Sequence, residues 1–227
     1  MRVGVLGTGI VGQSIAAKLA ELGHEAMIGT RDPAATLARS EPDPVYGTAP
    51  FRVWHEQHPD VKLGSFAEAA AHGELVVNAT AGAASLDALG QAGEANLAGK
   101  PLLDIANALD FSAGMPPSLL VANTDSLAER IQRAFPAARV VKTLNTMNAL
   151  VMVNPEQLAA GDHHVFVCGD DPEAKARATE LLTEFGWRHV IDLGDITAAR
   201  ATEMVLPIWL RLMGVLQTPM FNLKVVT

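Results

Sequence analysis

A glycine-rich turn near the start of the chain constrains the fold more than any other feature of the sequence. The apolar run 3–6 leads directly into the sequence GTGIVG at 7–12, and apolar residues then recur at helical spacing over 15–22. A strand, a G-x-G-x-x-G turn and a helix in this order are typical of a dinucleotide-binding unit. The glycines permit a tight turn, close approach of the backbone to a diphosphate, and close packing of the helix on the strand. The residues predicted to line the diphosphate are Gly7, Thr8, Gly9, Ile10, Val11 and Gly12.

The end of the second predicted strand indicates which dinucleotide would bind. In NAD-binding units an Asp or Glu, about 20 residues after the turn, holds the ribose 2′-hydroxyl. Here Thr30 and Arg31 occupy that place. A carboxylate would repel a 2′-phosphate, whereas a guanidinium can form a forked, charge-assisted contact with it. We therefore predict NADP(H) in preference to NAD(H), with Thr30 and Arg31 at the 2′-phosphate. The alternative is that Arg31 is only a solvated residue after a strand. Asp32 lies one position late for a ribose contact and is expected to open the next turn.

Alternation of strand and helix patterns predicts an α/β fold. Apolar runs at 75–79, 100–105 and 139–144 alternate with helical patterns, and the connections are short. We expect a Rossmann-type, doubly wound, mostly parallel sheet in residues 1–150. Residues 151–227 are expected to form a small C-terminal helical lobe that contains the last strands and an apolar helix. The proline-rich stretch 33–60 is expected to be a surface excursion.

Composition narrows the class of protein. The formal net charge of −8 argues against nucleic acid and against anionic membrane surfaces, because both require clustered Lys and Arg. The single cysteine, Cys168, lies in an apolar run and is expected to be a buried, unreactive residue. His55 and His58 have the spacing of two metal ligands but no third ligand, so no metal site is expected. A core strand at the very start leaves no room for a signal peptide, and we expect a cytoplasmic enzyme or sensor.

The predicted carboxyl ends of the strands are polar but poor in charge. Thr8, Thr80, Asn107 and Asn145 stand there, without a His, Cys or Glu in any of these tips. A dehydrogenase that acts on an alcohol or ketone usually needs a general acid or base within hydrogen-bond reach. The tips therefore favour an acceptor that handles its own protons, such as a flavin-like ring.

The pattern over 196–216 predicts a long helix whose second half is almost entirely apolar. A membrane-spanning helix needs about 20 apolar residues. Arg211 would lie in its middle, and Pro207 interrupts its hydrogen bonds, so a membrane span is not expected. We expect instead that a second subunit, the nicotinamide cleft, or both bury this helix, which predicts a homodimer.

Several segments resemble the NADP reductases that depend on the deazaflavin coenzyme F-420, together with related dinucleotide-binding oxidoreductases. These segments are MRVGVLGTGIVGQSIAAKLAELGHE, GTR, VVKTLNTMNA, VFVCGDDPEAK, IDLGDITAAR and EMVLPIWLRLMG. The VVKTLNT segment is also similar to the cytosolic reductase domain of membrane metalloreductases, which uses NADPH and a flavin. The resemblance implies direct hydride exchange between NADP(H) and a deazaflavin or flavin ring, in a cleft between the Rossmann domain and the C-terminal lobe of a homodimer.

The resemblance also implies roles for individual residues. The residues that would flank the nicotinamide are Thr80, Ala81, Gly82 and Ala106. The residues that would face the second ring are Asn145, Met147, Asn148 and Pro207. Asn145 is a candidate for an amide hydrogen bond to one ring, and its alternative role is to cap a strand end. No catalytic side chain is assigned. Two other functions stay open: a non-catalytic NADP(H)-binding redox sensor, and an NADPH-dependent imine or carbonyl reductase, which would require a proton donor that the sequence does not identify.

Overall fold

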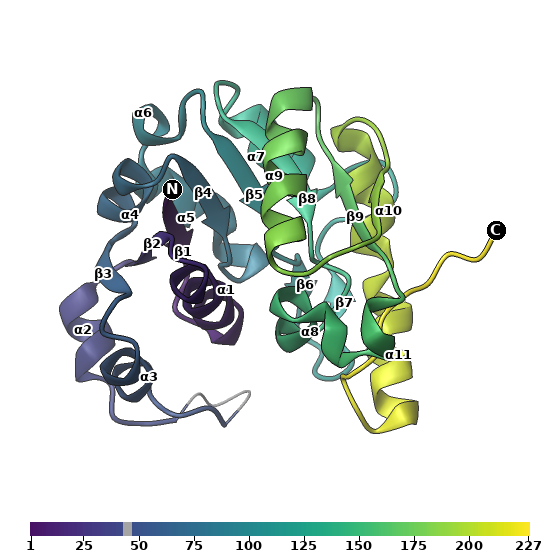
Figure 1. Cartoon of the computed structure of the whole chain (residues 1–227), viewed down its shortest axis with the longest axis horizontal. Helices are drawn as coiled ribbons and strands as arrows, with labels where there is room; N and C mark the ends of the chain where they lie inside the picture. Colours follow the sequence, from purple (N-terminus) through teal and green to yellow (C-terminus); the bar gives the residue numbers. More distant parts are fainter. Residues whose placement is uncertain (43–46) are drawn as a thin grey trace.

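A computed structural model describes residues 1–42 and 47–227. Within these residues an eight-stranded sheet has the order β10-β9-β8-β5-β4-β1-β2-β3 (Figure 1). Its strands are β1 (Arg2–Leu6), β2 (Glu25–Thr30), β3 (Lys62–Ser65), β4 (Leu75–Asn78), β5 (Pro101–Asp104), β8 (Arg139–Thr143), β9 (Val165–Cys168) and β10 (Val190–Asp192). A separate two-stranded ribbon pairs β6 (Leu109–Asp110) with β7 (Ser118–Leu119). The predicted α/β, Rossmann-type, mostly parallel sheet is confirmed.

Strand direction changes once in the sheet. The neighbours from β8 to β3 pair in parallel, whereas β9 pairs antiparallel with β8, and β10 is parallel to β9. Both β9 and β10 come from the region beyond residue 150, so the sheet continues across the predicted boundary between the domain 1–150 and the lobe 151–227. The division into these two parts stays a prediction.

The helices cover both faces of the sheet. They are α1 (Ile10–Glu21), α2 (Pro33–Ala38), α3 (Phe51–Gln57), α4 (Phe66–His72), α5 (Ser85–Ala92), α6 (Glu94–Leu97), α7 (Leu127–Ala134), α8 (Ala149–Val153), α9 (Pro172–Glu184), α10 (Ala199–Met204) and α11 (Leu206–Leu216), with short 3-10 turns η1 (Gly82–Ala84), η2 (Pro155–Gln157), η3 (Ala159–Gly161) and η4 (Ile196–Ala198). One buried cluster contains residues of α1, α8 and α9, and the other contains residues of α4, α5 and α7. Because side chains alternate along β1, Val5 belongs to the first cluster and Leu6 to the second.

Pairing register brings the predicted site residues to one edge of the sheet. Leu6 at the end of β1 pairs with Asn78, Asn78 with Asp104, and Asp104 with Lys142. The glycine turn and the segments that follow β4, β5 and β8 therefore begin side by side at the carboxyl edge. Ligands of open α/β sheets bind at this edge, where the chain order reverses between β1 and β4.

Local signals account for several helix boundaries. Ser65 caps α4, and the capping box with Glu68 is complete. Asp171 caps α9, with Pro172 in the first turn. Within the proline-rich stretch, residues 43–46 lie outside the described residues, and α3 packs the buried Phe51 against the core.

Cys168 is fully buried, as expected, and burial raises the pKa of its thiol to about 12.

The long helix expected at 196–216 is divided into η4, α10 and α11. Pro207 lies in the first turn of α11, where a missing N–H costs no hydrogen bond, so a new helix begins there. In α11, Ile208 is 58% exposed and Val215 is 80% exposed. None of the described helices combines the length and the apolarity that a membrane crossing requires.

Candidate functional site

The glycine turn has the close packing that its sequence predicts. Gly7 has φ +121° and donates its N–H to Gly29 O at 2.9 Å. A Cβ on Gly12 would lie 2.1 Å from the Gly7 carbonyl oxygen, so that position requires glycine for packing. A Cβ on Gly9 would meet nothing within 4 Å. Gly9 is the N-cap of α1, and the space beside it is open where a diphosphate would approach the helix N-terminus.

A cavity of about 490 Å³ begins at this turn. It is lined by Thr8, Gly9, Gln13, Ala38, Arg39, Ser40, Glu41, Pro42, Thr48, Ala49, Pro50 and Phe51. The cavity thus joins the loop that would hold the diphosphate to the segment after α2. The open backbone at Gly9, the helix N-terminus and a guanidinium in one cavity fit a phosphorylated dinucleotide.

The predicted 2′-phosphate residues have different surroundings. Arg31 is exposed, whereas Thr30 is only 7% exposed and its hydroxyl is hydrogen-bonded to the Thr36 hydroxyl at 2.9 Å. Arg39 Nη2 also donates to Thr36 Oγ1, at 3.3 Å, and so lies near the end of β2. Asp32 caps α2 by accepting the Ala35 N–H at 2.9 Å, which confirms that it opens the next turn.

Arg39 is a basic residue that sequence reasoning missed. It stands beyond α2 and outside the strand-end position that the fingerprint describes. The Asp-Pro pair at 32–33 could have indicated its position, because this pair starts the short helix α2 and Arg39 directly follows that helix. The site therefore has two arginines, Arg31 and Arg39, at the end where the 2′-phosphate is expected.

The predicted nicotinamide residues gather at the ends of β4 and β5. A Cβ on Gly82 would lie 2.2 Å from the Asn107 carbonyl oxygen, so the two strand ends are pressed together. Thr80 Oγ1 donates to Asn78 Oδ1 at 2.7 Å. Ala106 is buried at the end of β5, and its N–H donates to Asp104 Oδ1 at 3.3 Å. Ala81 is exposed next to Thr80.

The residues predicted to face a second ring differ in accessibility. Asn145 is 2% exposed, and its Nδ2 donates to both Asn107 Oδ1 and Thr202 O at 3.1 Å. These two bonds use both amide hydrogens and tie the end of β8 to its neighbours, and the contact of Asn145 with a ring stays a prediction. Met147 is 6% exposed and packs in the core, Asn148 caps α8, and Pro207 is exposed on α11.

A buried ion cluster lies beneath these strand ends. We use that name for Asp104, Lys142 and Glu203, whose side chains are at most 4% exposed. Lys142 Nζ lies 2.8 Å from Asp104 Oδ2 and 3.1 Å from Glu203 Oε1. Burial alone would lower the pKa of Lys142, but the charges of Asp104 and Glu203 outweigh it and hold that pKa above its ordinary value. Sequence reasoning missed this cluster, although a lysine inside an apolar strand was a signal, because a buried charge needs a partner.

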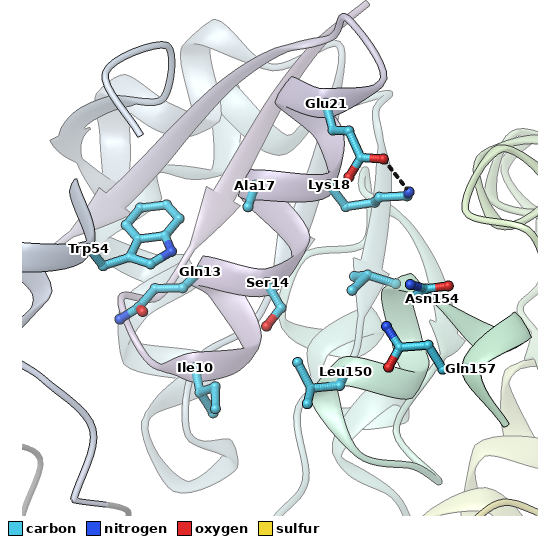
Figure 2. A pocket seen from close by; sticks show the side chains of 11 residues that line it. Ile10, Gln13, Ser14, Ala17, Lys18, Glu21, Trp54, Leu150, Asn154 and Gln157 are labelled. Atoms are coloured by element: carbon cyan, nitrogen blue, oxygen red, sulfur yellow. Dashed lines mark hydrogen bonds and ion pairs between the residues drawn. The ribbon is translucent and has the colours of Figure 1, made fainter. Parts of the chain in front are cut away.

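A second hollow runs along α1, with a volume of about 380 Å³. Figure 2 shows its lining: Ile10, Gln13 and Ser14 project from α1, Trp54 lies on one side, and Leu150 lies across from them on α8. A Lys18–Glu21 ion pair of 2.9 Å lies toward the far end of α1. Ile10 and Gln13 border both the helix N-terminus and this hollow, so the hollow adjoins the turn that would hold the diphosphate. Among the described residues no group of His, Cys, Asp and Glu side chains is arranged to hold a metal ion.

Together the sheet, the glycine turn and the two arginines near the end of β2 are typical of a dinucleotide-binding protein of the Rossmann type. The family model described as "NADP oxidoreductase coenzyme F420-dependent" matches residues 2–108. A crystal structure from Arthrobacter sp. FB24, provisionally described as an F420-dependent NADP reductase, is 60% identical, with full coverage of both chains and a TM-score of 0.96. The chain belongs to this family of NADP-dependent oxidoreductases.

Two curated relatives are more distant. The F420-dependent NADP reductase of Methanothermobacter marburgensis is 27% identical over 216 residues, which cover 93% of this chain and 92% of that protein. Metalloreductase STEAP3 of Rattus norvegicus is 26% identical over 213 residues, which cover 92% of this chain but only 38% of that protein. The likeness to the metalloreductase thus concerns less than half of its length.

Proposed function

We propose that this protein transfers a hydride between NADP(H) and a deazaflavin, coenzyme F-420, or a flavin-type ring. One observation carries the choice of acceptor. At the carboxyl ends of β4, β5 and β8, the described strand residues with ionisable side chains are Asp104 and Lys142, and these are buried and paired with each other and with Glu203. They offer no general acid or base to a bound carbonyl or imine. A ring that exchanges its own proton with solvent does not need one.

The residues have distinct roles in this proposal. The N–H groups of Gly9, Ile10 and Val11 at the start of α1 bind the diphosphate, with Thr8 beside them. Arg31 binds the 2′-phosphate, with Thr30 at the same strand end, and Arg39 supplies a second guanidinium. Bound NADPH supplies a hydride from its nicotinamide, and the acceptor ring takes that hydride and a proton from water.

The strand ends position the two rings in this proposal. Thr80, Ala81, Gly82 and Ala106 flank the nicotinamide, and small side chains there let a flat ring lie against the backbone. Met147, Asn148 and Pro207 border the acceptor. Holding two rings at about 3–3.5 Å can lower the barrier by several kcal/mol through orientation alone.

A homodimer is part of the proposal. The exposed apolar side chains Ile208, Val215 and Leu216 lie on α11, and Phe111 and Met115 are exposed in the segment between β5 and α7. The Sδ of Met204, at the end of α10 just before α11, accepts a hydrogen bond from the Asn123 N–H at 3.4 Å. The segment between β5 and α7 therefore meets the C-terminal helices. An apolar face built from both would be covered by the same face of a second copy.

The experiment is an acceptor panel with the purified chain. We expect oxidation of NADPH with coenzyme F-420, FMN or FAD, measured by absorbance, and a mass twice that of one chain by light scattering. Tight NADPH binding without oxidation by any ring would favour a redox sensor. Oxidation with cyclic imines or ketones alone would favour an imine or carbonyl reductase and would contradict the proposal.

The nucleotide preference gives a separate prediction. Arg31→Ala should weaken NADPH binding by about 10- to 100-fold, because a charge-assisted contact with phosphate contributes about 1.5–3 kcal/mol. NADH binding should change by less than about twofold, since NADH lacks the 2′-phosphate. Titration calorimetry with both nucleotides measures the effect. Arg2→Ala is the control that should change neither affinity, because Arg2 lies at the start of β1, away from the glycine turn. Equal losses for both nucleotides in Arg31→Ala would remove Arg31 from the phosphate site.

A further inference from the structure

The Lys142 ammonium is held by three acceptors, two at the end of β5 and one on α10. Its Nζ donates to Asp104 Oδ2 at 2.8 Å and to the Ala106 carbonyl oxygen at 2.5 Å, and it lies 3.1 Å from Glu203 Oε1. An ammonium has three hydrogens, and these contacts use all of them. Lys142 is therefore neither accessible to a substrate nor free to donate elsewhere. The ammonium instead fixes the positions of the Asp104 and Glu203 carboxylates and of the Ala106 backbone.

Asp104 extends this fixation to both strand ends on the nicotinamide side. Its Oδ1 accepts the Asn78 Nδ2 hydrogen at 2.8 Å and the Ala106 N–H at 3.3 Å. Asn78 Oδ1 in turn accepts the Thr80 hydroxyl at 2.7 Å. The N–H and the carbonyl of Ala106 are thus both held from inside the protein, and Thr80 is held through one intermediate side chain.

Glu203 connects the same ammonium to the C-terminal helices. It lies on α10, and its two oxygens accept the N–H groups of Leu127 and Ala128 at the start of α7, at 2.8 and 3.2 Å. The preceding residue, Thr202, accepts the Asn145 amide through its carbonyl oxygen. The start of α11, which follows directly, is therefore held at a fixed position relative to the strand ends.

We propose that Lys142 is a positioning residue for the nicotinamide half of the bound dinucleotide. It sets the Ala106 backbone and the Thr80 side chain, and it fixes both against α10, so that the surface for the ring is preformed. The inference rests on the proposed function, because that function places the nicotinamide at these strand ends. The adenosine half would bind at the glycine turn and the arginines. Among the described residues these share no hydrogen bond or ion pair with Lys142, so binding of the adenosine half should not depend on it.

The test compares the whole dinucleotide with its adenosine half. Binding of NADPH and of 2′,5′-ADP is measured by calorimetry for wild type and for Lys142→Met. Because Lys142→Met leaves two buried carboxylates unpaired, a second variant combines it with Asp104→Asn and Glu203→Gln. The Asn oxygen can keep the bonds to Asn78 and Ala106, and the Gln oxygen can keep one of the two bonds to the start of α7, so this variant removes the ammonium without leaving a buried charge unpaired. Lys100→Met is the matched control, since Lys100 Nζ also donates to a backbone carbonyl, Ala70 O at 2.8 Å, but at the start of β5.

The expected result is a selective loss. NADPH affinity should fall by about 10- to 100-fold in both Lys142 variants, whereas 2′,5′-ADP affinity should change by less than about twofold. Lys100→Met should change neither affinity. If wild type binds both ligands and the variants lose affinity for both equally, or for neither, Lys142 is only structural and the inference fails while the nucleotide site stands. If wild type binds neither ligand, the proposed function fails and the inference fails with it.

Discussion

Lys142→Met should lower the free energy of unfolding by about 3–5 kcal/mol, because it leaves two buried carboxylates without their counter-charge. Asp104 and Glu203 are 0% and 4% exposed at the side chain, so water cannot replace the ammonium without opening the core. The loss is a large part of the roughly 5–15 kcal/mol by which a domain is stable. In a domain of this size it corresponds to a fall of about 6–20 °C in melting temperature. Urea unfolding followed by circular dichroism measures it.

The pH dependence separates this cause from simple loss of packing. In wild type the raised pKa of Lys142 keeps its stabilisation intact at every pH below its ordinary value of about 10.4, and that stabilisation is lost only at higher pH. Lys142→Met has no ammonium to titrate, so its deficit relative to wild type should be constant below a pH of about 10 and should shrink at higher pH, where wild type loses the Lys142 stabilisation. A deficit that stays unchanged above this pH would show that packing alone was lost. Lys100→Met, which breaks a partly exposed contact, should cost less than about 1.5 kcal/mol.

The sequence was sufficient for the features that depend on neighbouring residues. The strand, turn and helix around Gly7 follow from local spacing, and so do the caps at Ser65 and Asp171. The parallel direction of the strands from β1 to β8 in the eight-stranded sheet follows from their alternation with helices. In each case the residues that determine the structure lie within a few positions of one another, where propensity and hydrogen bonding act directly.

The rest depends on residues that are far apart in the sequence. Asp104, Lys142 and Glu203 meet only because β5 pairs with β8 and α10 returns to the strand ends, and no local pattern specifies that register. The same limit applies to the antiparallel direction of β9, which its apolar run does not encode. The sequence nevertheless held one indication of the ion cluster, which is Lys142 inside the apolar run of β8. A buried lysine requires a carboxylate partner, and Asp104 at the end of the preceding apolar run was available.

Gly9→Ala should lose NADPH binding but keep its stability, whereas Gly12→Ala should lose stability. A Cβ at residue 9 meets nothing within 4 Å, and φ −74° with ψ 176° suits alanine, so the variant should fold with a loss of about 1 kcal/mol or less at this N-cap. Its methyl group would enter the space of the diphosphate and weaken NADPH binding by about 10- to 100-fold, as expected for 1–3 kcal/mol of overpacking. A Cβ at residue 12 would lie 2.1 Å from the Gly7 carbonyl oxygen, so Gly12→Ala should lose about 3 kcal/mol or more of stability before any ligand is added.

Thermal melting with and without NADPH distinguishes the two cases. Wild type should melt higher when NADPH is present, because a ligand that binds only the folded state stabilises it by mass action. Gly9→Ala should melt near wild type without NADPH and gain little from it, whereas Gly12→Ala should melt well below wild type in both conditions. Gly90→Ala is the matched control, since its Cβ also meets nothing within 4 Å but lies on α5, away from the turn; it should keep the full NADPH shift. A full NADPH shift in Gly9→Ala would mean that no diphosphate approaches the backbone at this turn, and the proposed cofactor position would have to be abandoned.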